Sequence, residues 1–228
     1  MPALPPPVSR VREFLKRIAF RNEALAFLSA PSYQYNLEVA QLVFLVQELD
    51  RTTAMTGAIA EVGVARGLTT VFLTRHLDEI GDQRRYLALD TFSGFTAADV
   101  DHEVAARGKG RADFGVFGYN DVTVFRRNMQ RLGLTRVDAR QGDVGLLTPA
   151  DVGLVSVVLL DVDLYRPTAR ALPVLYECLQ PGGVIMVDDV IEHTRYDGAA
   201  QAYYEFVGAR GLPIEIVAGK GGIIRKLA

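Results

Sequence analysis

Short apolar runs alternate with amphipathic stretches along most of this 228-residue chain, and this alternation constrains its fold more than any other feature. The apolar runs predict seven strands, at 58–63, 86–90, 137–142, 154–161, 184–188, 214–217 and 223–226. Stretches with a 3.6-residue period predict helices between them, at 68–79, 121–132, 167–179 and 198–209. Because most of these strands are apolar throughout, we expect a mostly parallel sheet buried between two layers of helices.

The two ends of the chain depart from this pattern. The loop 218–221 between the last two predicted strands is so short that these strands must pair antiparallel. Before the first strand, 8–30 and 37–49 predict two helices with apolar stripes. We therefore expect an N-terminal helical part at 1–53, which caps the site or pairs with another subunit, and a sheet domain at 54–228. Apolar stripes of this kind predict a homodimer or a larger homo-oligomer.

One internal segment, 91–119, has no clear period and contains several glycines and phenylalanines. A loop of this length in a compact domain is usually a lid over a binding site or a disordered insertion. We therefore expect it to cover part of the site.

The charge balance argues against several classes of protein. Lys and Arg number 25 and Asp and Glu 27, which gives a formal charge of −2 and disfavours nucleic-acid binding through phosphate neutralisation. No apolar run approaches the roughly twenty residues of a membrane-spanning helix, so we expect no membrane partner. The proline-rich residues 1–8 lack the order of a secretory signal, and we expect a cytoplasmic protein. The single cysteine, Cys178, lies in an apolar run and is interpreted as a core residue.

Acidic residues stand at or near the carboxyl ends of five predicted strands: Glu61, Asp90, Asp143, Asp161 and Asp188. In an open α/β sheet, ligands bind outside the carboxyl ends of the strands, near the point where the strand order reverses. A single aspartate after a strand is most often a turn former or a helix cap. Five acids at one edge of a sheet favour a ligand site instead.

The first of these acids opens the sequence Glu61–Gly67, between a predicted strand and a predicted helix. Its glycines let the backbone approach a ligand, and the helix N-terminus offers free N–H groups to a carboxylate or phosphate. The dinucleotide fingerprint is absent, because Ala65 and Leu68 stand at its second and third glycine positions. Asp90, at the end of the next strand, can accept both hydroxyls of a ribose. Together these features predict a nucleoside that carries a small charged tail.

A second acidic group, formed by Asp161, Asp163, Asp188 and Asp189, follows two strands that we expect to lie side by side. Carboxylates at neighbouring strand ends repel each other strongly unless a cation lies between them. Hard oxygen ligands favour Mg²⁺ over Zn²⁺, with Ca²⁺ or Mn²⁺ as alternatives. The other interpretation is structural, with Asp189 in a turn and Asp163 solvated.

Four spaced motifs together carry a family resemblance. They are Glu61–Gly67, Asp90–Phe95, Leu160–Tyr165 and Pro181–Asp189. From about Leu37 to the C-terminus, the chain resembles the class I S-adenosylmethionine-dependent methyltransferases, and more narrowly the macrocin (TylF-like) O-methyltransferases of antibiotic biosynthesis. The resemblance implies a doubly wound, Rossmann-like α/β fold whose seven-stranded, mostly parallel sheet has the order 3-2-1-4-5-7-6.

The resemblance also implies roles for individual residues. It implies that S-adenosylmethionine is bound by Glu61, Gly63, Gly67, Thr69, Thr70, Asp90, Ser93 and Asp143. Within that set, Asp90 would bind the ribose and Asp143 the adenine amine. Similarity to metal-dependent O-methyltransferases implies that Mg²⁺ is held by Asp161, Asp188 and Asp189. A metal that coordinates a hydroxyl lowers the pKa of that hydroxyl and orients it for attack on the methyl group.

The resemblance leaves the general base open. Catechol-type enzymes carry a lysine base three residues after the aspartate that corresponds to Asp161, and here that position is Leu164. We take His193 as the first candidate base, beside Asp161 as a catalytic residue, because a neutral imidazole accepts a proton near pH 7. The alternative is that His193 is an ordinary surface histidine.

The sequence thus predicts an S-adenosylmethionine-dependent and Mg²⁺-dependent O-methyltransferase. Its acceptor would be a hydroxyl of a small molecule, namely a sugar, a macrolide or a phenolic natural product. One alternative is a nicotinamide-dependent oxidoreductase on the same sheet, although Ala65 and Leu68 count against it. The other alternative is a non-catalytic nucleoside-binding protein that forms oligomers.

Overall fold

The computed structural model describes residues 7–22, 24–25, 33–35 and 37–227, and it divides into two compact units, 1–35 and 36–228. The first unit contains helix α1 (Pro7–Arg21), on which Phe14 and Leu15 are exposed. The predicted helix 8–30 therefore ends earlier, and its residues 26–30 lie outside the described part. Asn22 Oδ1 accepts a 3.0 Å hydrogen bond from Ala24 N, a local bond that competes with continuation of the helix.

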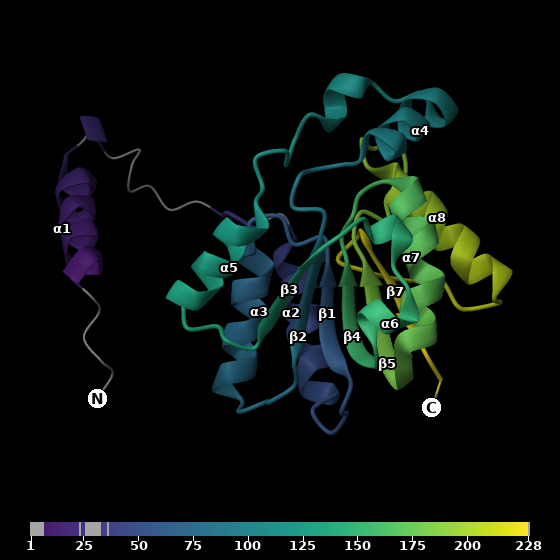
Figure 1. Ribbon diagram of the computed structural model, residues 1–228, viewed down its shortest axis with the longest axis horizontal. Coiled ribbons are helices and arrows are strands. Elements are labelled where there is room, and N and C mark those ends of the chain that lie inside the picture. The colour runs from purple at the N-terminus through teal and green to yellow at the C-terminus, as the bar shows by residue number, and fades with distance from the viewer. Residues whose placement is uncertain (1–6, 23, 26–32, 36, 228) are drawn as a thin grey trace. The chain divides into compact units, whose positions relative to one another are not determined.

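The second unit is a seven-stranded sheet with helices on both faces (Figure 1). Its strands are β1 (Ala58–Val62), β2 (Tyr86–Asp90), β3 (Val137–Gln141), β4 (Val155–Leu160), β5 (Leu179–Val187), β6 (Glu215–Val217) and β7 (Gly221–Arg225). Its helices are α2 (Val39–Arg51), α3 (Leu68–Glu79), α4 (Ala97–Arg107), α5 (Val122–Arg131), α6 (Pro149–Val152), α7 (Tyr165–Cys178) and α8 (Asp197–Ala209). Two short 3₁₀ turns follow α4 and β3, at η2 (Arg111–Phe114) and η3 (Val144–Leu146).

The strand order is β3-β2-β1-β4-β5-β7-β6, which confirms the order and the mixed sheet that the sequence predicted. Strands β1 to β5 pair parallel, whereas β7 pairs antiparallel with both β5 and β6. The order reverses between β1 and β4, where Asp161 N donates a 2.8 Å hydrogen bond to the Val62 carbonyl oxygen. Loops that leave the two strands diverge there, so a site opens at their carboxyl ends.

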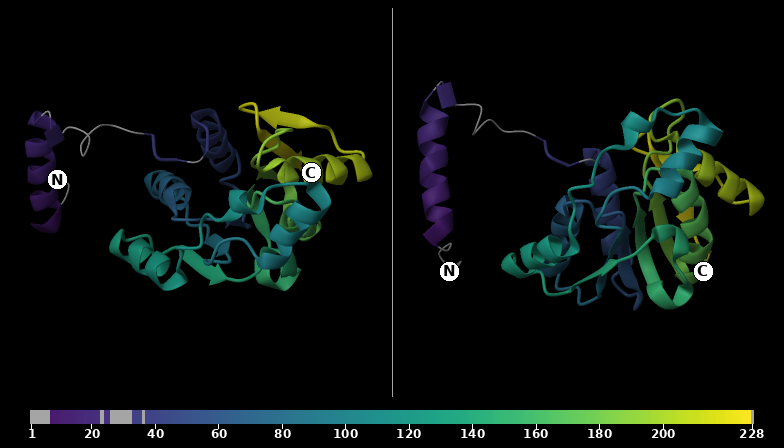
Figure 2. Two further views of the ribbon diagram at one scale, coloured as in Figure 1. Left: turned by 90° about the horizontal axis from the view of Figure 1, so that it is seen from above. Right: turned by 45° about the horizontal axis from the view of Figure 1, so that its top comes forward.

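Both faces of the sheet are covered, as the fully buried strands β1 and β4 require. On one face, Val62 and Leu160 pack in a cluster with Leu172 of α7. On the other face, Ala88 of β2 packs with Phe125 of α5. Figure 2 shows these helices on either side of the sheet. Within the described residues, no helix combines the length and apolar content that crossing a membrane requires.

The segment 91–119 contains a helix, α4, which corrects the expectation of a loop without periodic structure. Thr96 caps α4 by accepting a 3.2 Å hydrogen bond from Asp99 N. Glu103, which is almost fully buried, accepts a 2.7 Å hydrogen bond from the backbone N–H of Tyr165. A contact across 62 positions thus anchors α4 to the start of α7. In Figure 1, α4 lies above the upper ends of the strands.

Strand β5 begins earlier than the predicted strand 184–188 and includes Pro181–Gly183, which lie between that predicted strand and the predicted helix 167–179. The side chain of Gln180 accepts a 2.7 Å hydrogen bond from Gly57 N, and Gly182 N donates to the Lys226 carbonyl oxygen at 2.8 Å. Neighbouring segments therefore pair with this stretch even though proline and glycine disfavour strands.

Helix α2 belongs to the second unit, together with the sheet. Its residue Glu48 lies 2.9 Å from the guanidinium of Arg225 in β7. The predicted division into an N-terminal part at 1–53 and a sheet domain at 54–228 stays a prediction about function.

Candidate active site

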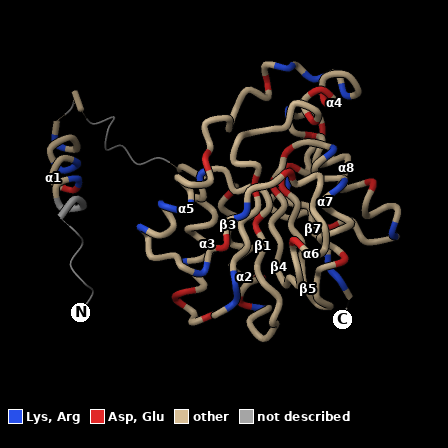
Figure 3. The backbone as a smooth tube through the Cα atoms, in the orientation of Figure 1, with Lys and Arg blue, Asp and Glu red and all other residues tan. Residues whose placement is uncertain are grey.

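A cavity of about 940 Å³ opens at the carboxyl ends of the parallel strands. The predicted site residues in its lining are Glu61, Gly63, Thr69, Asp90, Asp143, Asp161, Asp188 and Asp189. Outside the lining lie Gly67, Thr70, Ser93 and His193. Figure 3 shows acidic residues gathered along this upper edge of the sheet. Residues far apart in the sequence thus meet in one hollow, because parallel strands end at the same edge.

The loop after β1 requires a glycine at position 63. Gly63 has a φ of +88°, and a Cβ there would lie 1.8 Å from the carbonyl oxygen of Asp161. Gly67, with a φ of +82°, is the N-cap of α3, where a Cβ would lie 2.6 Å from the Phe125 ring. The backbone therefore passes close to the end of β4, and Leu68 and Thr69 at the start of α3 line the cavity.

Asp90 fixes this loop from the neighbouring strand. Its Oδ2 atom accepts hydrogen bonds from Val64 N at 2.8 Å and from Ala65 N at 3.1 Å. Its Oδ1 atom accepts a 2.6 Å hydrogen bond from Phe92 N. The carboxylate thus has one orientation in the cavity wall, with backbone donors on both oxygens. Each oxygen has two lone pairs, so any ligand hydroxyl would share them with these donors.

Glu61 is buried beneath the loop, with 1% of its surface exposed. Its Oε2 atom accepts hydrogen bonds from the Thr70 hydroxyl at 2.5 Å and from the Tyr86 hydroxyl at 2.7 Å. Burial raises the pKa of Glu61 to about 7, although these two hydrogen bonds oppose the shift. Thr70 thus holds the Glu61 side chain in place. The contact between Thr70 and the cofactor stays a prediction.

Two other predicted cofactor residues have different surroundings. Asp143 is the N-cap of η3 and accepts a 2.8 Å hydrogen bond from Gly145 N at one edge of the cavity. Ser93 is exposed, and its backbone N–H donates to the Thr91 hydroxyl at 3.3 Å. Neither contact involves a cofactor, so the cofactor roles of Asp143 and Ser93 stay predictions.

Four carboxyl groups gather on the other side of the cavity, and we call Asp161, Asp163, Asp188 and Asp189 the acid cluster. Burial, followed by the negative charge of neighbouring members, raises the pKa of Asp161 and of Asp163 well above the usual range. For Asp163, the charge of Asp189 has the largest effect after burial. Both residues have a positive φ, of 64° and 57°, which is a strained conformation at a non-glycine residue.

A lysine that sequence reasoning passed over lies inside the acid cluster. Lys220 Nζ is 3.1 Å from Asp188 Oδ2 and 2.9 Å from Asp189 Oδ1. Burial alone would lower the pKa of Lys220, but the two carboxylates outweigh it and raise the pKa above its usual range. Lys220 is therefore protonated at neutral pH in this structure. The signal was the hairpin loop 218–221, which antiparallel pairing of β7 with β5 returns to the carboxyl edge.

The residues of the acid cluster suit a hard divalent cation by their chemistry. The described residues include no three His, Cys, Asp or Glu side chains already arranged to hold a metal ion. Four carboxyl groups nevertheless share this side of the cavity with one ammonium group, and burial together with their mutual repulsion raises the pKa values of Asp161, Asp163 and Asp188. Asp161, Asp188 and Asp189 could hold Mg²⁺ here only if the Lys220 ammonium gave up its place.

Another part of the cavity wall is aromatic. Phe95 and Phe117 line it, with ring centroids 5.7 Å apart in an edge-to-face arrangement. Tyr196 also lines it, 6.3 Å from the Phe95 ring. His193, the predicted base, is exposed outside the lining and has a φ of +63°. The cavity therefore joins a charged side to an apolar side, and His193 stays a candidate base only.

Comparison with known proteins decides which family this architecture represents. A sequence model of the family described as "Macrocin-O-methyltransferase (TylF)" matches residues 38–224. The chain belongs to this family. Macrocin-O-methyltransferases use S-adenosylmethionine, so the chain is an S-adenosylmethionine-dependent O-methyltransferase, as the sequence predicted. Membership counts against both the nicotinamide-dependent and the non-catalytic alternatives.

Individual relatives agree with this membership in the macrocin-O-methyltransferase family. The chain is 31% identical over 183 residues to the 8-demethyl-8-(2,3-dimethoxy-alpha-L-rhamnosyl)-tetracenomycin-C 4'-O-methyltransferase of Streptomyces olivaceus, with 75% of this chain and 67% of that protein covered. Among solved structures, the O-methyltransferase NovP matches with a TM-score of 0.69 at 20% identity, over 86% of this chain and 84% of NovP. The calicheamicin methyltransferase CalS11 matches with a TM-score of 0.65 at 17% identity, over 98% and 94%. These structures share the fold with the macrocin-O-methyltransferase described here.

Proposed function

We propose that this enzyme transfers the methyl group of S-adenosylmethionine to a sugar hydroxyl of a natural product in antibiotic biosynthesis, and that Mg²⁺ takes part. The observation that carries the proposal is a single cavity whose lining includes residues of the glycine loop (Glu61–Gly67), Asp90 and the acid cluster. A cofactor and an acceptor must meet in one hollow for direct transfer, because the reacting atoms need to approach to about 3 Å.

The sugar as acceptor rests on the relatives. The Streptomyces enzyme acts on a rhamnosyl group, as its name states, and a CalS11 structure is described as a TDP-rhamnose 3'-O-methyltransferase. The aromatic wall formed by Phe95, Phe117 and Tyr196 suits the apolar face of such a sugar or its aglycone. Macrolide and phenolic hydroxyls stay open as acceptors, and binding assays with each class would separate them.

For the cofactor, we propose that the backbone of the glycine loop accommodates the methionine part and that Asp90 accepts the ribose hydroxyls. Thr69 would lie near the cofactor carboxylate, at the start of α3, where backbone N–H groups favour an anion. The cofactor ammonium near Glu61 would favour the charged form of that side chain. Asp143 would accept from the adenine amine.

For the metal, we propose Asp161, Asp188 and Asp189 as ligands. When bound, Mg²⁺ would lower the pKa of the acceptor hydroxyl and fix its direction. Methyl transfer moves the methyl group from sulfur to oxygen and releases the hydroxyl proton, which the enzyme must accept. Asp161 and His193 are the candidates for that step, and the remaining residues of the cavity hold the two substrates in line.

The test of the cofactor site is calorimetry with S-adenosylhomocysteine. We expect binding by the wild-type enzyme and none by Asp90→Ala. A matched control is Asp101→Ala, because Asp101 is exposed on α4 outside the cavity lining. Unchanged binding by Asp90→Ala would remove the basis of the cofactor proposal.

The test of the metal is methyl transfer to a rhamnosyl acceptor after treatment with EDTA. We expect loss of activity and its recovery with Mg²⁺. Activity that is indifferent to EDTA would show a metal-free reaction. The homo-oligomer and the cytoplasmic location stay predictions, and a monomer in sedimentation would refute the first.

A further inference from the structure

Lys220 lines the cavity, and neither the family resemblance nor the proposed reaction assigns it a role. Its side chain is 19% exposed, while those of Asp188 and Asp189 are 3% and 16% exposed. An ammonium group in contact with two carboxylates at this depth is weakly screened by solvent. It therefore neutralises part of the acid cluster and does more than a surface ion pair.

The backbone that carries Lys220 is held in place. Its carbonyl oxygen accepts a 2.7 Å hydrogen bond from Val190 N, two residues after Asp188, and its own N–H donates to the Val217 carbonyl oxygen at 3.3 Å. The hairpin loop is thus joined to the turn after β5, which also carries Asp188 and Asp189. If the ammonium group leaves the acid cluster, the Lys220 side chain must therefore move while its backbone stays in place.

The ammonium group competes with a metal for the same oxygens. Oδ1 of Asp188 accepts a 2.7 Å hydrogen bond from Gln41 Nε2, which uses one of its two lone pairs, and Lys220 contacts the other oxygen, Oδ2. Magnesium binds carboxylate oxygens at about 2.0–2.1 Å and requires near-octahedral geometry. An ammonium at 2.9–3.1 Å from oxygens of two of the same carboxylates competes with the metal for them, and the two positive charges repel each other.

We propose that Lys220 is a displaceable counter-cation. In the metal-free enzyme its ammonium group holds Asp188 and Asp189 together, and a divalent cation that binds these carboxylates drives the lysine side chain out of the acid cluster. This inference rests on the metal part of the proposed function. It predicts two states of one side chain, which can be observed without measuring catalysis.

The first test is lysine labelling of the wild-type enzyme, which needs no variant. A brief pulse of an acetylating reagent, followed by mass spectrometry, is applied with EDTA and then with Mg²⁺. We expect Lys220 to be protected with EDTA and labelled several-fold faster with Mg²⁺. Lys226 is an internal control, because its ammonium group contacts the carbonyl oxygens of Tyr176 and Glu177 away from the cavity. Equal or slower labelling of Lys220 with saturating Mg²⁺ would overturn the proposal.

The second test is Mn²⁺ binding, followed by electron paramagnetic resonance, in the wild type, Lys220→Met and the control Lys226→Met. Loss of a competing unit charge at this distance should tighten Mn²⁺ binding by about tenfold in Lys220→Met alone. The same variant should have a lower metal-free Tm, which Mg²⁺ restores. Binding of equal affinity in all three proteins would overturn displacement but keep the metal. Absence of Mn²⁺ binding in all three would overturn the metal site, and displacement with it.

Discussion

Gln41 in α2 donates a 2.7 Å hydrogen bond to Oδ1 of Asp188, a residue 147 positions further along the chain. Gln41 has no exposed surface, and its own Oε1 atom accepts a 2.9 Å hydrogen bond from Glu38 N. The amide therefore has a single orientation, and its hydrogen bond fixes the orientation of the Asp188 carboxylate. Helix α2 thus sets the direction of an acid that we propose as a metal ligand.

Replacement of Gln41 by leucine tests this positioning. We expect Gln41→Leu to lower the free energy of unfolding by about 1–3 kcal/mol, because a buried carboxylate loses its donor. We also expect weaker Mn²⁺ binding, which a purely structural role would not produce. Urea unfolding and electron paramagnetic resonance measure the two effects. Gln130→Leu, on the exposed face of α5, is the control and should change neither.

Gly63→Ala tests the close approach of the loop to β4. The substitution combines an unfavourable φ of +88° with a Cβ placed 1.8 Å from a backbone oxygen. Gly133→Ala separates the two effects, since Gly133 has a φ of +73° and open space where the Cβ would lie. We expect a cost of about 1–2 kcal/mol for Gly133→Ala and at least about 2 kcal/mol more for Gly63→Ala. Equal costs in urea unfolding would contradict the clash.

The ionisation of Glu61 should make the free energy of unfolding depend on pH. Its folded-state pKa of about 7 exceeds the unfolded value of 4.5, so folding favours the protonated form. The stabilisation is fully present below pH 4.5 and is lost as the pH rises through about 7. A shift of this size corresponds to up to about 3 kcal/mol.

The matched variant for this effect is Glu61→Gln, which keeps an oxygen acceptor but cannot ionise. Urea unfolding of the cofactor-free proteins between pH 4.5 and 8 should show the wild type losing stability relative to Glu61→Gln. Parallel stability curves for the two proteins would show that the folded-state pKa is not raised.

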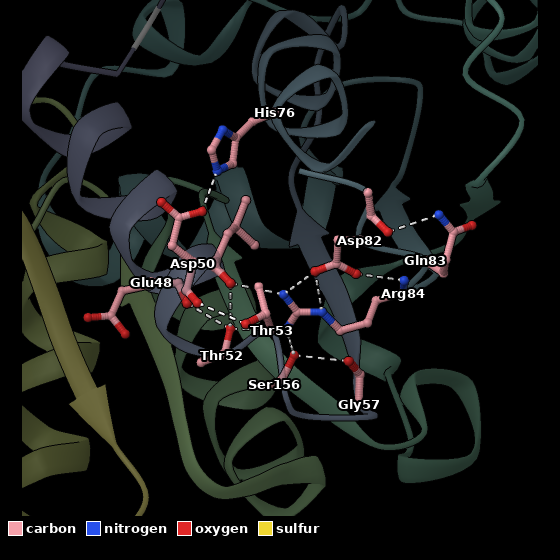
Figure 4. Close-up of polar contacts among 12 residues, drawn as sticks. Glu48, Asp50, Thr52, Thr53, Gly57, His76, Asp82, Gln83, Arg84 and Ser156 are labelled. Atoms are coloured by element: carbon pink, nitrogen blue, oxygen red, sulfur yellow. Dashed lines mark hydrogen bonds and ion pairs between the residues drawn. The ribbon is translucent and has the colours of Figure 1, made fainter. Parts of the chain in front are cut away.

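A buried ion pair lies at the edge of the sheet opposite the cavity. We expect it to contribute to stability but not to cofactor binding. Arg84 lies 2.5 Å from Asp82, and it donates to Ser156 Oγ at 2.9 Å and to Thr52 Oγ1 at 3.0 Å (Figure 4). Burial alone would raise the pKa of Asp82, but the hydrogen bonds from Arg84 outweigh it and lower that pKa. The network ties the end of α2 to the starts of β2 and β4, away from the cavity.

We expect Arg84→Met to cost about 3–5 kcal/mol, because it leaves the carboxylate of Asp82 buried without its partner. Arg85→Met is the control, since Arg85 is 48% exposed and lies 3.8 Å from Asp138. An exposed pair of that kind contributes about 0–1 kcal/mol. Binding of S-adenosylhomocysteine by folded Arg84→Met should equal that of the wild type. Loss of binding would mean that the two edges of the sheet are coupled.

The two candidates for the proton acceptor can be replaced in turn, and Asp161→Asn also removes a proposed metal ligand. We expect a loss in kcat/KM of at least about 100-fold for Asp161→Asn, and a smaller loss for His193→Asn. The reason is that Asp161 lines the cavity, whereas His193 is exposed outside it. A larger loss for His193→Asn than for Asp161→Asn would identify the histidine as the base.

Local patterns were sufficient for most of the fold. The strand 86–90 and the helix 68–79 have the bounds that their periodicity predicts, because side-chain burial repeats within each element. The acids at the strand ends could also be predicted to share one hollow, since parallel strands end at the same edge. Helix α4 could not be predicted, because it is anchored by the contact between Glu103 and Tyr165 N, which sequence periodicity does not reveal.

The sequence by itself determined the order of the sheet, the glycine loop, the family resemblance and the set of carboxylates in the cavity. Only the tertiary structure decided which cation those carboxylates meet and how they are held. Lys220 reaches Asp189 across 31 positions through the pairing of β7 with β5, and Gln41 reaches Asp188 from a helix near the other end of the chain. Such contacts depend on how completed elements pack against one another, and residue spacing along the chain does not encode that packing.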